Sequence, residues 1–204
     1  HDDRRAAARA GEPYIRQAFI ARGKNKKFAD AAGFERALYL IRKRAEHSLK
    51  FPNENGSNRF YIPSLSSRTI VYKGMLLASQ MEDYYPELKD PDMVSALALV
   101  HSRFSTNTFP NWNRAHPYRY IIHNGEINTI ARLREQAQLI NVELTRGGSD
   151  SQDLDRLLAT LIHKYHFTLT EAMELAFPPI LSEVEKFPPD LQAVYKYYRQ
   201  AFGP

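Results

Sequence analysis

The sequence contains no cysteine among its 204 residues. These residues therefore hold no disulfide, no zinc site or iron–sulfur cluster with thiolate ligands, and no thiol nucleophile. Chemistry that they perform must use oxygen or nitrogen groups, or a group that a partner supplies.

Long apolar runs are missing as well. Residues 96–100 form one of the longest, far below the roughly 20 residues that a membrane span needs. Residues 1–5 are rich in charge, and the apolar run of roughly 7 to 15 residues that marks a signal peptide does not follow them. The sequence thus predicts a cytoplasmic protein with no membrane partner.

Aromatic and other apolar residues are plentiful. The chain is 43% hydrophobic and has 11 Phe, 12 Tyr and 1 Trp, and burial of such residues offsets the ordering entropy that keeps polar, highly charged chains disordered. A chain of this length buries about 70% of its unfolded surface around one core. We therefore expect a single folded domain.

Positive charge is concentrated at the start of the chain. The formal net charge is +5, but residues 1–50 carry 13 Lys/Arg and 6 Asp/Glu, so the remaining residues are slightly acidic. The basic segment at residues 22–27 would neutralise phosphates if it bound a nucleic acid. No nucleic-acid motif accompanies it, so the favoured interpretation is a solvated loop and no nucleic-acid partner.

Two periodicities predict the secondary structure. Apolar residues recur at helical spacing over 34–45 and at strand spacing over 118–123, and Ser149 and Gln152 match a Ser-x-x-Gln capping box. We expect helices at residues 13–21, 34–45, 76–88, 127–140, 149–162, 170–177 and 189–202. We expect strands at residues 60–65, 69–73, 96–104 and 118–123. This order predicts an α+β, layered architecture rather than a regular βαβ series.

Three polar segments follow expected strands or turns, at residues 101–108, 123–126 and 147–151. Taken singly, each has a plain structural explanation: an ion-pairing arginine, an Asn-Gly hairpin turn and a helix N-cap. Taken together, they offer the groups that hold an amino acid whose side-chain carbonyl is attacked. Arg103 is suited to a carboxylate, Asp150 to an ammonium group, and Asn124 with the backbone N–H of Gly125 to a developing oxyanion.

These three polar segments, together with two stretches that precede them, closely resemble the glutaminase domain of the glutamate synthase large subunit. That domain is a class II glutamine amidotransferase with an N-terminal nucleophile. The matching stretches are FERALYLIRKRAE at 34–46, SLSSRTIVYKG at 64–74, ALVHSRFSTNTFP at 98–110, RAHPYRYIIHNGEINT at 114–129 and GGSDS at 147–151.

This resemblance implies a layered α/β/β/α fold of the N-terminal-nucleophile hydrolase type and a role for each matched residue. Arg103 would hold the α-carboxylate of L-glutamine, with Phe104 and Thr106 lining the same strand end. Asp150 would accept the α-ammonium group, and Asn124 and Gly125 would form the oxyanion hole. In this family a cysteine attacks the glutamine amide.

The resemblance also implies what the rest of such an enzyme contains. The released ammonia passes to a flavin domain, where 2-oxoglutarate is aminated and reduced to glutamate. The remaining domains are expected to hold FMN and an iron–sulfur cluster, with a small NADPH-oxidising subunit or ferredoxin as electron source. No cofactor is expected in residues 1–204 themselves.

Two departures from the family pattern refine this expectation. Nothing near residue 1 matches the segment that carries the nucleophilic cysteine, and after residue 130 the family's Arg-Gly-Asn and Asn-Trp-Met stretches are replaced by a shorter route to Gly147. Residues 1–204 are thus expected to be part of one glutaminase domain that lacks the nucleophile segment, and to be inactive alone.

Other interpretations of the same residues stay open. A non-catalytic paralogue would keep the fold and bind glutamine without hydrolysing it. His101, His116 and His123 could ligate a metal, but no carboxylates lie at ligand spacing around them and a metal site is not expected. His123, next to the expected oxyanion hole, is predicted to orient a catalytic group instead.

Overall fold

The computed structural model describes residues 9–24, 28, 30–51, 60–102, 110–145 and 147–201. It divides into two compact units, unit 1 over residues 1–125 and unit 2 over residues 126–204, and each is considered by itself below. Among the described residues, no helix is both long enough and apolar enough to cross a bilayer.

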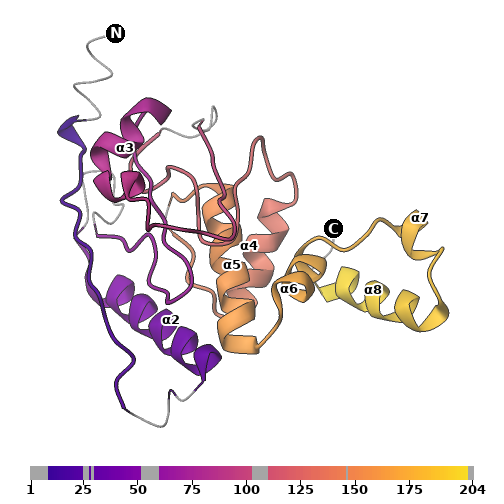
Figure 1. Cartoon of the computed structure of the whole chain (residues 1–204). Helices are drawn as coiled ribbons and strands as arrows, with labels where there is room; N and C mark the ends of the chain where they lie inside the picture. The colour runs from indigo at the N-terminus through magenta and orange to yellow at the C-terminus, as the bar shows by residue number, and fades with distance from the viewer. Residues whose placement is uncertain are drawn as a thin grey trace. The chain divides into compact units, whose positions relative to one another are not determined.

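The longest helix of unit 1 is α2 (Ala31–Ser48), which confirms the helix predicted over 34–45 (Figure 1). Asp30 caps its first turn by accepting a hydrogen bond from the Gly33 N–H at 2.6 Å. The helix buries Leu38 and Tyr39 and also, less usually, the charged side chains of Glu35 and Arg42. Its inner face is therefore partly polar.

Most of the other described residues of unit 1 are irregular, and residues 78–89 form three short helical turns. These are η2 (Ala78–Gln80), α3 (Met81–Tyr84) and η3 (Pro86–Lys89), so the helix predicted over 76–88 is broken into pieces. The helix predicted over 13–21 is wrong: the backbone there is irregular, and Tyr14 and Phe19 are 80% and 89% exposed. An amphipathic pattern forms a stable helix only when its apolar face has a partner.

No strand forms among the described residues, so the expected strand segments at 60–65, 69–73, 96–104 and 118–123 are irregular wherever the structure describes them. A strand exists only when a second strand satisfies its backbone hydrogen bonds. Leu97 and Val100 illustrate the result, because their side chains remain 76% and 77% exposed. The helical part of the predicted α+β architecture is observed, and its layering is not.

Aromatic rings form the centre of unit 1. Tyr85 packs against Tyr72 and Tyr84, with ring centroids 4.9 and 5.0 Å apart, and Tyr84 packs against Trp112 at 5.6 Å. Gly74 lies directly against Trp112: a Cβ at residue 74 would come within 2.5 Å of the indole ring. Glycine is required here by the close approach of the ring.

The regular structure described in unit 2 consists of helices, and four of them confirm predicted helices (Figure 1). Ser149 caps α5 by accepting a hydrogen bond from the Gln152 N–H at 3.2 Å, as the sequence predicts. A short helix, α7, was not predicted. The helices are α4 (Ile130–Leu139), α5 (Asp150–Tyr165), α6 (Leu169–Ala176), α7 (Leu181–Val184) and α8 (Pro189–Ala201).

An apolar core around α5 holds unit 2 together. Helix α5 packs against α4 on one side and α6 on another, and α8 contacts α6 and α7. Leu157, Leu158 and Leu161 of α5 are at most 2% exposed, as is Leu133 of α4. This is the usual arrangement in which apolar stripes on neighbouring helices are buried against each other.

Candidate active site

The expected carboxylate-binding residues lie outside the described part of the chain. Arg103, Phe104 and Thr106 fall within residues 103–109, of which nothing structural is said. On the near side of this segment, His101 is half-buried and Ser102 is exposed.

The expected oxyanion residues, Asn124 and Gly125, are exposed at the end of unit 1. The Asn124 Oδ1 accepts a hydrogen bond of 2.8 Å from the His101 Nε2–H. Within the described residues, neither the Asn124 Nδ2 nor the Gly125 N–H has a hydrogen-bond acceptor. Two donors are therefore available side by side in the chain.

Gly125 has a backbone conformation that glycine adopts readily and other residues avoid. Its φ is +98°, while a Cβ at this position would meet no atom within 4 Å. The requirement for glycine comes from the backbone torsion and not from lack of space.

Behind His101 lies a stack of rings. His101 stacks on His116 with centroids 4.4 Å apart and an interplanar angle of 25°, and His116 meets Tyr118 edge-on at 4.7 Å. The buried Lys73 closes the stack: its Nζ lies 4.6 Å from the Tyr118 ring centroid and donates to the Asn113 carbonyl at 2.7 Å.

The prediction that His123 orients a catalytic group stays a prediction, and the structure adds which histidine contacts Asn124. The contact with Asn124 is made by His101, and the His123 Nδ1 is buried with no hydrogen-bond partner among the described residues. Among all the residues that the structure describes, no group of three or more His, Asp or Glu side chains is placed to hold a metal ion.

A buried carboxylate, that of Glu35, connects several matched stretches of unit 1. It accepts hydrogen bonds from Ser66 Oγ at 2.7 Å, from Ser67 N at 2.5 Å and from Ser67 Oγ at 2.6 Å. The Arg119 Nη2 lies 3.9 Å away. Burial acts to raise the pKa of Glu35, but the three hydrogen bonds and the Arg119 charge outweigh it, so the net pKa is lowered.

Asp150, the expected ammonium acceptor, is the first residue of α5 in unit 2 and is half-buried. Its Oδ1 accepts from the Ser151 N–H at 2.6 Å, and its Oδ2 accepts from the Ile127 N–H at 2.9 Å. These bonds fix the carboxylate in one orientation and leave further lone pairs on both oxygens.

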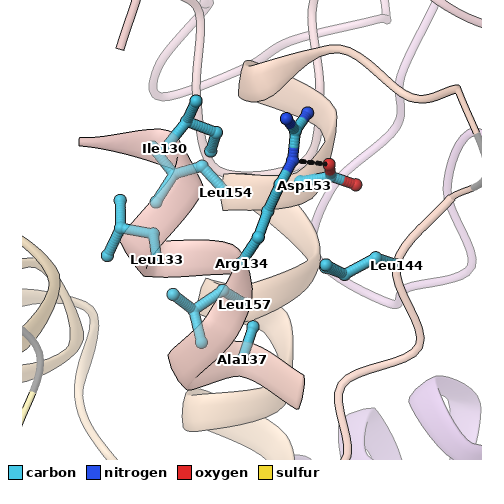
Figure 2. A pocket seen from close by; sticks show the side chains of 8 residues that line it. All are labelled: Ile130, Leu133, Arg134, Ala137, Leu144, Asp153, Leu154 and Leu157. Atoms are coloured by element: carbon cyan, nitrogen blue, oxygen red, sulfur yellow. Dashed lines mark hydrogen bonds and ion pairs between the residues drawn. The ribbon is translucent and has the colours of Figure 1, made fainter. Parts of the chain in front are cut away.

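An ion pair holds the turn that precedes Asp150 (Figure 2). The Arg134 Nε donates to Asp153 Oδ2 at 2.7 Å, and its Nη2 donates to the Gly148 carbonyl at 3.3 Å. The Asp153 Oδ1 accepts from the Thr145 N–H at 3.3 Å. Arg134 and Asp153 thereby brace both ends of the turn that leads into α5.

Apolar side chains surround the buried Asp153 end of this ion pair, whereas Arg134 is partly exposed. They come from α4, from α5 and from Leu144 in the segment between the helices (Figure 2). The space among them is too small to admit water. Burial raises the pKa of Asp153, because the cost of desolvating the carboxylate exceeds the stabilisation from Arg134. The residues around the pair are Ile130, Leu133, Ala137, Leu144, Leu154 and Leu157.

A shallow groove of about 370 Å³ lies elsewhere in unit 1. Tyr14, Tyr84 and Tyr85 line it, and two carboxylates at its edge are already engaged: Glu12 accepts from the Tyr84 hydroxyl, and Glu87 accepts from Gln17 Nε2. None of the expected site residues lies in this groove.

Comparison with known families matches the family model of the class II glutamine amidotransferases to residues 3–204. The chain belongs to this family. The match includes the segments that hold Asn124, Gly125 and Asp150, and it agrees with the resemblance seen in the sequence. The class II amidotransferase family implies an N-terminal-nucleophile hydrolase fold for this domain.

Relatives of this amidotransferase chain are glutamate synthases. It is 41% identical over 209 residues to the NADPH glutamate synthase large chain of Bacillus subtilis, which covers 94% of this chain and 13% of the relative. It is 42% identical over 161 residues to the NADH glutamate synthase of Saccharomyces cerevisiae, covering 71% of this chain and 7% of the relative. A ferredoxin-dependent glutamate synthase of Antithamnion is 36% identical over 80% of this chain and 12% of its own length. The chain thus spans a small part of each relative.

Two features of the site were not predicted from the sequence. The His101–Asn124 contact joins residues 23 positions apart, and the Arg134–Asp153 pair joins residues 19 apart. A partial signal existed for the first, because His101 follows an apolar run directly. For the second, Arg134 stands in the stretch where this sequence departs from the family pattern, and only the helix packing reveals its partner.

Proposed function

We propose that these residues form part of the glutaminase domain of a glutamate synthase, in which L-glutamine is bound and its side-chain amide is hydrolysed. The observation that carries the proposal is a pair of donors, the Asn124 Nδ2–H and the Gly125 N–H, that have no acceptor among the described residues, within a chain that belongs to the class II amidotransferases. Two such donors are what an acyl-transfer site offers to a tetrahedral intermediate.

The reaction requires a nucleophile that these 204 residues do not contain, since they have no cysteine. A thiolate from another segment would attack the side-chain amide carbon of glutamine, and the carbonyl oxygen would become an oxyanion. The Asn124 Nδ2–H and the Gly125 N–H would donate to this oxygen. The amide nitrogen would take up the proton that the thiol gave up on becoming a thiolate and would leave as ammonia, with a thioester formed in its place. Water would then hydrolyse the thioester to release glutamate and the thiol.

Substrate orientation is assigned to charged groups at the two ends of the amino-acid moiety. Arg103 would hold the α-carboxylate, with Phe104 and Thr106 beside it. Asp150 would accept the α-ammonium group. Support for Asp150 comes from its fixed carboxylate, whose oxygens already accept the Ser151 and Ile127 N–H groups and so need not reorganise on binding.

The remaining assignments follow from the relatives and concern the complete protein. Residues 1–204 would be part of one α/β/β/α domain, with the missing strands completed by pairing partners outside the described residues. The other domains would hold FMN and an iron–sulfur cluster and would use the ammonia to make glutamate from 2-oxoglutarate. Relatives named for NADPH, NADH and ferredoxin each suggest a different electron source.

A non-catalytic glutamine-binding paralogue is the second candidate. It would retain Asp150 and the fold without using the oxyanion donors. The two functions differ in the role of Asn124. A glutaminase hydrolyses glutamine and needs Asn124 for the rate of this reaction, whereas a binding protein does not hydrolyse glutamine.

Steady-state kinetics of glutamate release by the complete protein tests the proposal. Asn124→Ala should lower kcat by about a hundredfold, because one of two oxyanion donors is lost. Asp150→Asn should raise KM for glutamine by about tenfold or more, because an ammonium group loses a charged acceptor.

Matched controls are available for both substitutions. Asn128 is also exposed and follows in the same motif, and Asp190 is likewise an acidic residue in the first turn of a helix. Asn128→Ala and Asp190→Asn should leave both constants within about twofold of their original values. The proposal is wrong if Asn124→Ala and Asn128→Ala have the same kcat.

A further inference from the structure

We propose that His101 is a positioning residue of the oxyanion site: its Nε2–H holds the Asn124 carboxamide in the one orientation that presents Nδ2 to the reacting oxygen. This inference rests on the function proposed above, in which Asn124 is an oxyanion donor.

The first step of the argument concerns the chemistry of the amide. The Asn124 Oδ1 can only accept a hydrogen bond, and the 2.8 Å contact is with His101 Nε2, so that nitrogen must carry the proton. A carboxamide is planar, so fixing Oδ1 also fixes the direction of Nδ2. If the amide turned over, the Nδ2–H groups would face the Nε2–H, and the hydrogen bond would be replaced by a clash of donors.

The second step concerns the exposure of Asn124. An exposed asparagine in water exchanges freely between amide orientations, and half of them offer an acceptor where the oxyanion develops. Asn124 is exposed, and the hydrogen bond from His101 is what the described residues supply to select one orientation. Catalytic donors stabilise a transition state only when they are already aligned before charge develops.

The third step concerns what holds His101 itself. Its ring lies parallel to that of His116, within 25° and 4.4 Å, and His116 rests edge-on against the buried Tyr118. Lys73, 5% exposed, covers the Tyr118 ring and is tied to the Asn113 carbonyl. His101 is thus placed on a ring stack that is anchored in the interior of unit 1.

The proton on Nε2 is present in two forms of the imidazole, the neutral Nε2–H tautomer and the imidazolium ion. The hydrogen bond to Asn124 therefore requires a proton on Nε2, which both the neutral Nε2–H tautomer and the charged ring provide. A side chain with an N–H at the same distance from the backbone should replace histidine. Glutamine meets this condition, because its Nε2 occupies a position similar to that of the imidazole Nε2.

The test uses glutamate release by the complete protein, with two substitutions that separate the N–H group from the ring. His101→Phe keeps a ring on His116 and removes the donor. It should lower kcat about tenfold with KM for glutamine unchanged, which is the effect of one net hydrogen bond lost in the transition state alone. His101→Gln keeps the donor and loses the stack, and its kcat should stay within about threefold of the original value.

A double substitution decides whether His101 acts through Asn124. In the Asn124→Ala background, His101→Phe should lower kcat by less than about twofold, because the group that it positions is gone. His47, exposed on α2, serves as the control: His47→Phe should change neither constant. If His101→Phe does not fold, as judged by its thermal midpoint, His101→Met removes the donor in its place.

The possible results separate this inference from the proposed function. If Asn124→Ala has normal kcat, the oxyanion assignment fails, and the inference fails with it. If Asn124→Ala is impaired but His101→Phe is normal, or if the two effects multiply in the double variant, the positioning role is overturned while the oxyanion assignment stands. Impairment of His101→Gln equal to that of His101→Phe would also contradict the role.

Discussion

Each of the two units contains a buried carboxylate beside an arginine, Glu35 in unit 1 and Asp153 in unit 2, and the pKa values of these two groups shift in opposite directions. Asp153 of unit 2 has the shorter ion pair, 2.7 Å to Arg134, yet its pKa is raised because burial dominates. Glu35 of unit 1 lies 3.9 Å from Arg119, yet its pKa is lowered because three hydrogen bonds from Ser66 and Ser67 outweigh burial. Burial is the largest influence on both pKa values, and the hydrogen bonds and the arginine together outweigh it only at Glu35.

The same contrast extends to how each unit is built. Unit 2 buries leucines between regular helices, whereas the described part of unit 1 has one long helix and joins its irregular segments through aromatic rings and through the hydrogen bonds of Glu35. We expect loss of apolar volume to affect unit 2 most and loss of one charged acceptor to affect unit 1 most. Trp112, the single tryptophan, is 5% exposed in unit 1, so its fluorescence reports on that unit, whereas most of the described helix, and so most of the helical signal, belongs to unit 2.

The largest effect is expected from Leu158→Ala in unit 2. Leu158 is fully buried in α5, and its truncation leaves a cavity, so the free energy of unfolding should fall by about 3 kcal/mol. Urea unfolding followed by circular dichroism at the helical band measures it. Leu139→Ala is the control, because Leu139 is 75% exposed on α4 and should cost less than about 0.5 kcal/mol. Equal losses for both variants would show that the described core of unit 2 is wrong.

A smaller effect is expected from Glu35→Gln in unit 1. The substitution keeps the size of the side chain but places an amide group among serine donors and leaves Arg119 without its counter-charge. The free energy of unfolding should fall by about 2 kcal/mol, measured by Trp112 fluorescence. Glu82→Gln, at an exposed position of the same unit, should have an effect below about 0.5 kcal/mol. If Glu35→Gln and Glu82→Gln have the same free energy of unfolding, Glu35 does not stabilise unit 1 in the way proposed here.

The smallest expected effect concerns how the free energy of unfolding depends on pH, because the two carboxylates should contribute to it with opposite signs. Because the pKa of Glu35 is lowered by folding, its stabilisation is present above its unfolded value of about 4.5 and is lost as the pH falls through the folded value. Because the pKa of Asp153 is raised, stability decreases as the pH rises from its unfolded value of about 3.8 through the folded value.

Stability measured at about pH 3.5 and pH 7 checks these signs. The advantage of the original chain over Glu35→Gln should shrink at the lower pH, and its advantage over Asp153→Asn should grow. The same trend for both variants would remove the distinction between the two carboxylates.

The helices of unit 2 were predictable because their signals are local. Ser149 caps α5 three residues before Gln152, and the leucines of that helix recur at helical spacing. The failures at 13–21 and at the expected strands share one cause. A pattern identifies a face that needs burial, such as that of Phe19 or Val100, but it does not identify the partner that buries it.

The site shows the same division. Asn124, Gly125 and Asp150 could be selected from the sequence, because residue types that suit an amino acid and an oxyanion stand at turns and helix starts. His101 was considered only as one of three possible metal ligands, in a site that was not expected, and an orienting role was predicted for His123. The His101–Asn124 contact depends on how residues 101–102 and 123–124 fold together, which no spacing rule contains.

The central claim is that these residues bind and polarise glutamine for a thiol that lies outside them. Glutamate release from glutamine, measured side by side for the 204-residue chain and for the complete protein, tests it most directly. The account predicts release by the complete protein, abolished by a thiol-alkylating reagent, and none by the chain alone, which has no cysteine. Release by the isolated chain, or by the fully alkylated protein, would contradict it.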